Sequence, residues 1–109
     1  MSWLALISHF AGGAVLANAV PHTACGMMGR PFQSPFAKPP GEGLSSSTAN
    51  VLWGFANLVA GYLLVFQVGQ FEITSGTDAA STGLGSLLIA VFSARHFGRF
   101  NGGNLPSTK

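Results

Sequence analysis

Histidine and cysteine are the residue types in this sequence that could bind a metal, and His22 and Cys25 form an H-x-x-C pair. Neutral imidazole and thiolate both ligate transition metals, although a closed zinc site needs four ligands. His96 could reach the same layer of the protein, and Met27 or Met28 could add thioether ligands that suit copper. His22, Cys25 and His96 are therefore a candidate metal site, although nothing in the sequence requires a cofactor.

His9 differs from the other two histidines because it lies inside an apolar stretch, residues 2–20, that has no charged residue. An ionisable side chain inside a membrane span is a functional hypothesis by default. His9 could ligate haem or a metal as neutral imidazole, or it could carry a proton. The alternative is a neutral histidine that hydrogen-bonds to a neighbouring helix. We expect His9 on the opposite side of the bilayer from the other histidines.

Polar and small residues also recur on a second apolar stretch, where Asn50, Gly54, Asn57 and Gly61 share one helical face. Helices in lipid pack through small residues, so this face predicts contact with another helix, within the chain or in a homo-oligomer. Gly12 belongs to a similar stripe on the first stretch. The asparagines could form interhelical hydrogen bonds or line a polar pathway. A third, approximate stripe consists of Gly83, Ser86, Ala90 and Ala94.

Four basic residues predict a rim on one side of the membrane: Arg30, Lys38, Arg95 and Arg99. Contact with anionic lipid headgroups would explain this rim, and a site for a phosphorylated or carboxylate ligand is the alternative. Cytoplasmic loops carry the excess of basic residues in multi-pass membrane proteins. We therefore expect the N-terminus outside and the C-terminus in the cytoplasm.

The composition indicates the elements that position these residues. Only 7% of the residues are charged, whereas soluble domains carry about 25%. A helix of about 20 apolar residues crosses the hydrocarbon core of a bilayer. We therefore predict an all-α membrane protein with three transmembrane helices and a long Pro/Gly-rich loop between the first two. The predicted spans are 2–20, 48–69 and 79–97, the loop is 22–47, and a polar tail covers 98–109.

The whole chain, residues 1–109, is expected to form one integral membrane domain. Its net charge of +2, without a basic stripe, argues against nucleic-acid binding. Its expected partners are the lipid bilayer and either further copies or a larger membrane protein. The acidic residues Glu42, Glu72 and Asp78 are expected in loops, which argues against an antiporter that uses a membrane-embedded carboxylate.

The sequence favours a non-enzymatic function, as an accessory or assembly subunit or as a homo-oligomeric scaffold. Small-residue stripes that suit helix packing occur on all three spans, whereas few side chains could do chemistry. A small homo-oligomeric transporter or channel is the first alternative, with His9, Asn50 and Asn57 lining its path. A haem- or metal-binding redox subunit is the second alternative.

Overall fold

The computed structural model describes residues 2–103. Three long helices make up most of this part of the chain: α1 (Trp3–Met27), α2 (Ser47–Phe66) and α3 (Gly76–Asn101). A short antiparallel pair of strands, β1 (Phe32–Gln33) and β2 (Leu44–Ser45), lies between α1 and α2. Each helix is long and apolar enough to cross a membrane. The predicted helical class with three candidate spans is therefore confirmed.

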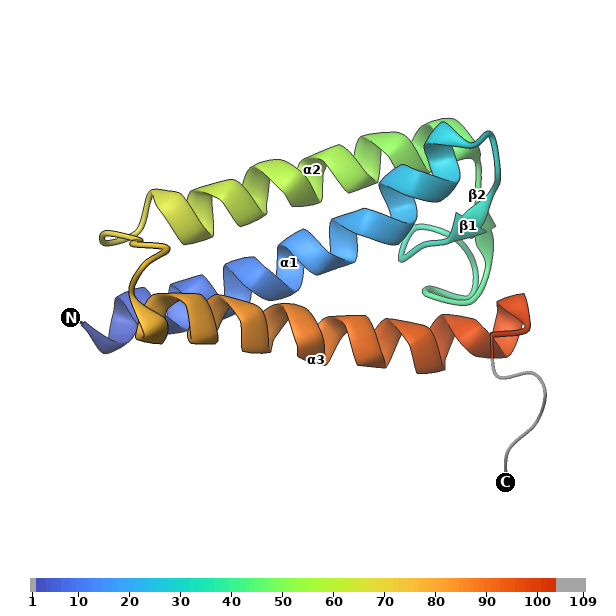
Figure 1. Cartoon of the computed structure of the whole chain (residues 1–109). Helices are drawn as coiled ribbons and strands as arrows, with labels where there is room; N and C mark the ends of the chain where they lie inside the picture. The colour runs from blue at the N-terminus through green and yellow to red at the C-terminus, as the bar shows by residue number, and fades with distance from the viewer. Residues whose placement is uncertain (1, 104–109) are drawn as a thin grey trace, which may run out of the picture.

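Helix α1 is the central element of the fold (Figure 1). It packs against α2 on one side and against α3 on the other. The molecule measures 41 × 35 × 22 Å, so the three helices form a flat layer. The start of α1 and the connection between α2 and α3 lie at one end of the layer, and the two strands lie at the other.

A serine is the N-cap residue of each of the three helices. Ser2 Oγ accepts a hydrogen bond from the Ala5 N–H, and Ser46 Oγ accepts one from the Ala49 N–H. Ser75 Oγ does the same for the N–H of Asp78. Each bond satisfies one of the backbone donors that the first turn of a helix leaves unpaired.

The first helix does not end near Pro21 as expected. Helix α1 continues through this proline to Met27, so the connection to α2 covers residues 28–46 and is shorter than the expected 22–47. A proline removes one intrahelical hydrogen bond, but neighbouring helices can compensate for it. Here His22 and Gly26 are buried beyond the proline, because α1 continues to pack on α2. Helix α3 is likewise longer at both ends than the expected span 79–97.

Glycines allow the backbones of α1 and α2 to approach closely. A Cβ atom on Gly12 would lie 2.6 Å from Val65 Cγ2, and one on Gly61 would lie 2.5 Å from Leu16 Cδ2. A Cβ on Gly54 would clash with the Thr23 side chain. The predicted small-residue faces of the first two spans thus meet each other within one chain.

Helix α3 contacts α1 through a face that shares Ser86 with the expected stripe but not Gly83. Ser81 Oγ donates to the Leu6 carbonyl at 2.7 Å, and Ser86 Oγ donates to the Gly13 carbonyl at 2.9 Å. Gly85 lies against the Phe10 carbonyl, with no room for a Cβ. Gly83, by contrast, faces open space. The expected stripe was therefore right at Ser86 and wrong at Gly83, because Ser81, Gly85 and Ser86 define the face that meets α1.

Candidate functional site

The polar side chains of the spans gather at three levels along α1. His9 marks the level near the N-terminal end, Asn18 the middle, and His22 the level near the strands. His9 and His22 are almost completely buried, with 0% and 2% of their surface exposed. Buried polar groups are costly unless they have hydrogen-bond partners, so the partners at each level determine what its groups can do.

His9 bonds through one ring nitrogen to the chain just beyond α2. Its Nε2 lies 3.0 Å from the carbonyl oxygen of Val68, and its ring meets the Phe71 ring edge-on at 5.4 Å between centroids. A carbonyl oxygen can only accept a hydrogen bond, so the Nε2–H donates to it. The other ring nitrogen, Nδ1, is buried and has no hydrogen-bond partner.

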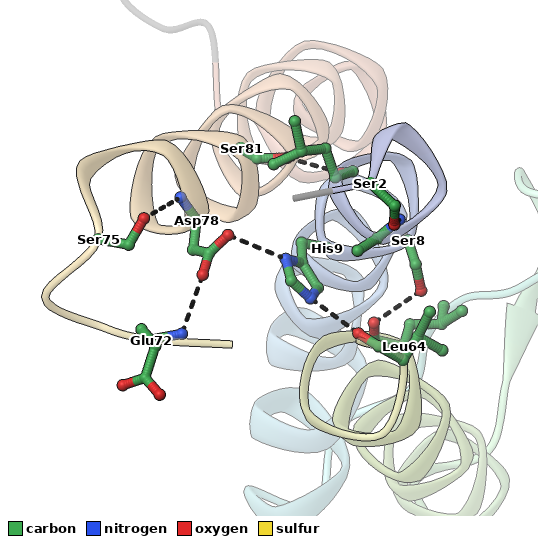
Figure 2. Close-up of polar contacts among 11 residues, drawn as sticks. Ser2, Ser8, His9, Leu64, Glu72, Ser75, Asp78 and Ser81 are labelled. Carbon is green, nitrogen blue, oxygen red and sulfur yellow. Dashed lines mark hydrogen bonds and ion pairs between the residues drawn. The ribbon is translucent and has the colours of Figure 1, made fainter. Parts of the chain in front are cut away.

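Asp78 lies opposite the free nitrogen of His9 (Figure 2). Its Oδ1 is 3.7 Å from His9 Nδ1, and its Oδ2 accepts a hydrogen bond of 3.0 Å from the Glu72 N–H. The sequence placed Asp78 in a loop, but the structure places it in the first turn of α3, where it is buried. The expectation that Asp78 lies in a loop is therefore wrong.

A cavity of about 310 Å³ adjoins Asp78. It is lined by residues from the start of α1, the connection after α2 and the start of α3: Ser2, Ala5, Gly69, Gln70, Glu72, Ser75 and Asp78. The carboxyl group of Asp78 thus lies between this cavity on one side and the buried imidazole of His9 on the other.

The middle level joins two asparagines. Asn18 Nδ2 donates to Asn57 Oδ1 at 3.1 Å, and Asn57 Nδ2 donates to the Trp53 carbonyl in its own helix at 2.8 Å. The pair is an interhelical hydrogen bond of the kind that stabilises helix packing in lipid.

The level near the strands is organised by Asn50, which is fully buried. Its Nδ2 donates to the carbonyls of Phe32, Ser45 and Ser46 at 3.0–3.2 Å. Its Oδ1 therefore faces His22, whose Nδ1 lies 2.7 Å away and donates the hydrogen bond. We call Asn50 with these four partners the Asn50 cluster. It ties α1 and the start of α2 to both strands.

Three aromatic rings surround the imidazole of His22. Phe32, Trp53 and Phe97 meet it edge-on, with centroids 5.4, 6.4 and 6.2 Å away. They come from β1, α2 and α3, so His22 is a point where the helices and the strands meet.

The candidate metal site does not assemble. His96 Nε2 bonds to the Gly41 carbonyl at 2.8 Å, and its Nδ1 accepts from Arg99 Nη2 at 2.9 Å. Cys25 is a free, half-buried cysteine. Among residues 2–103, no three His, Cys, Asp or Glu side chains gather closely enough to hold a metal ion.

The four residues of the expected basic rim, Arg30, Lys38, Arg95 and Arg99, are all exposed. They lie in the segment around the strands and in the last turns of α3, and both are at the same end of the layer (Figure 1). The Arg99 guanidinium also lies over the Phe100 ring, 5.2 Å from its centroid.

Asp78 is the site residue that reasoning from the sequence missed. A signal for it exists, because Ser75 followed three residues later by Asp78 is a helix-capping pattern that predicts the start of α3 before residue 78. No sequence signal points to the Val68 carbonyl, since every residue has a backbone carbonyl.

No family model, no curated protein and no solved structure matches this chain.

Proposed function

We propose that this chain is a multi-pass integral membrane protein that works without catalysis, as an accessory or scaffold subunit that binds other membrane proteins or further copies of itself. One observation carries the proposal. Ser8, Asn18 and His22 of α1 form hydrogen bonds to α2 inside the chain, and the glycines pack there, so one chain forms a three-helix unit. Such a unit can bind partners through its outer surface without rearranging its interior.

Helix α3 supplies the surface that best fits this function. Within α3, all of which is described, Asp78 and Gly85 are the only buried residues. Facing away from α1 is an apolar row that we call the outer stripe: Leu84, Leu87, Leu88 and Val91. These residues are spaced as in helices that pack lengthwise against another helix. The stripe therefore offers a contact surface inside the membrane.

A pore between copies is less well supported. His9, Asn50 and Asn57 were the residues expected to line such a path, and all three are buried between α1 and neighbouring elements of the same chain. Their hydrogen bonds are made inside the unit, so they are not available to water in a channel between chains.

We also propose that the end of the layer with the strands and the basic rim faces the cytoplasm. The rim consists of four exposed cations, and the positive-inside rule favours this side for them. The N-terminus and the connection between α2 and α3 then lie outside.

The experiment that tests the function is a native mass measurement in lipid nanodiscs. An accessory or scaffold subunit gives a defined complex heavier than one 11.2 kDa chain, containing either several copies or a second protein. A preparation that contains single chains alone would contradict the proposal.

A further inference from the structure

If His9 is neutral and Asp78 is ionised, no proton lies between the two side chains where they face each other. Because Nε2–H donates to the Val68 carbonyl, a neutral His9 carries a lone pair on Nδ1. An ionised Asp78 carries only lone pairs on its carboxyl oxygens. Nδ1 and Oδ1 face each other at 3.7 Å, so two acceptors would meet in a buried place.

Such an arrangement is unfavourable, because a buried carboxylate and a buried unpaired nitrogen each lose their hydration. One added proton removes the conflict. On Nδ1 it makes an imidazolium–carboxylate ion pair, and on Oδ1 it makes a carboxylic acid whose O–H faces the imidazole lone pair. A metal ion is a poorer fit, since no third His, Cys, Asp or Glu of residues 2–103 joins the pair.

We propose that His9 and Asp78 form a proton-binding site that holds one proton between Nδ1 and Oδ1 and thereby fastens the start of α3 to α1. The proton comes from water, enters through the cavity beside Asp78, and returns to water when the site empties. This inference does not depend on the proposed function, because the site lies inside a single chain.

Among the described residues, no charged group other than His9 and Asp78 faces this site from the neighbouring elements. From the chain that follows α2, the Val68 carbonyl and the apolar ring of Phe71 contact His9. The α2–α3 connection supplies the Glu72 N–H, while the exposed Glu72 carboxylate points away from His9 in Figure 2. From α1, Ser8 bonds to the Leu64 carbonyl, at 2.7 Å, and not to the ring. Asp78 is thus the only charged group directed at His9 among the described residues.

The site has a mechanical consequence because it holds the first turn of α3 to α1, ahead of the contacts that Ser81 and Ser86 make further along the helix. Asp78 is one of the two buried residues of α3, and it also orders the connection through the Glu72 N–H. Removing the proton places the Nδ1 lone pair against the carboxylate. The first turn of α3 should then separate from α1.

The test is nuclear magnetic resonance of the full chain in nanodiscs at about pH 7, where histidine ionisation is decided by its surroundings. Ring ¹⁵N shifts report which His9 nitrogens carry protons, and the side-chain ¹³C shift of Asp78 reports whether its carboxyl is protonated. We expect one shared proton, seen either as an imidazolium or as a carboxylic acid. A neutral His9 with bare Nδ1 beside an ionised Asp78 would overturn the proposal.

Two variants sharpen the test. In Asp78→Asn, the amide can donate to Nδ1 and still accept from the Glu72 N–H, so the fold is retained while the added proton is lost. Glu72→Gln is the matched control, since it removes the other acid of the same cavity and should leave the His9 signals unchanged. Loss of the proton in the control, or its retention in Asp78→Asn, would contradict the site.

Discussion

Two buried asparagines on α2 show how much a residue's role depends on its partners. Asn50 bonds to three carbonyls and one imidazole, from α1, both strands and the turn before α2. Asn57 makes one bond to another helix and one within its own helix. The same side chain on the same helical face therefore organises a whole end of the molecule in one case and adds a single contact in the other.

Asn50→Ala should destabilise the protein far more than Asn57→Ala. Truncating Asn50 leaves several buried groups unpaired, which costs about 2–3 kcal/mol. Truncating Asn57 removes one interhelical bond, worth about 0.6 kcal/mol in lipid. Unfolding in detergent with increasing dodecyl sulfate, followed by circular dichroism, measures both. Equal losses would mean that the Asn50 cluster does not hold the strands to the helices.

The spacing of the asparagines was sufficient to predict that they face another helix, because a helical face can be read from sequence. The partners of His9 and Asp78 could not be read in the same way. They depend on where the α2–α3 connection returns to α1, and no local pattern encodes that position. The separation of His22 and His96 is similar, since each of the two bonds to a group that only the folded chain brings near.

At the scale of elements, the packing of α3 depends on which of its glycines meets α1. Gly85 lies against the Phe10 carbonyl, while Gly83, two residues earlier, faces open space. Length and hydropathy were enough to predict three helices. They could not predict that α1 passes through Pro21, because packing on α2 maintains the helix there, nor the rotation of α3.

The two glycines form a matched pair for mutation. Gly85→Ala forces α1 and α3 apart and should cost about 1–3 kcal/mol, the usual range for overpacking. Gly83→Ala meets nothing and should be neutral or stabilising by up to about 1 kcal/mol, because alanine favours helix. The same unfolding assay measures both variants. A destabilising Gly83→Ala with a harmless Gly85→Ala would show that α3 is rotated relative to the described structure.

At the scale of the whole molecule, the flat layer has two chemically different ends. One end carries the strands, seen in Figure 1, and the exposed basic rim. The other end carries the His9–Asp78 pair, drawn in Figure 2, and the cavity beside Asp78. A layer with α1 in the middle leaves the outer faces of α2 and α3 apolar, as contact with lipid or with another membrane protein requires.

Cysteine labelling tests the orientation of these ends. Glu42 and Thr74 are exposed positions in the two connections, and cysteines introduced there in a Cys25→Ala background should label from opposite sides. An impermeant reagent outside intact cells is expected to reach the cysteine at 74 and not the one at 42. The reverse pattern would overturn the proposed orientation, and labelling of both would overturn the three-span arrangement.

Partner binding within the membrane is tested by the native mass in nanodiscs, measured on the unaltered chain and on two variants. We expect a defined complex heavier than 11.2 kDa, weakened when Leu84 and Leu88 of the outer stripe are both changed to alanine. Leu52→Ala, on the exposed face of α2, should leave the complex intact. Single chains in every preparation would contradict the claim that this protein functions by binding partners within the membrane.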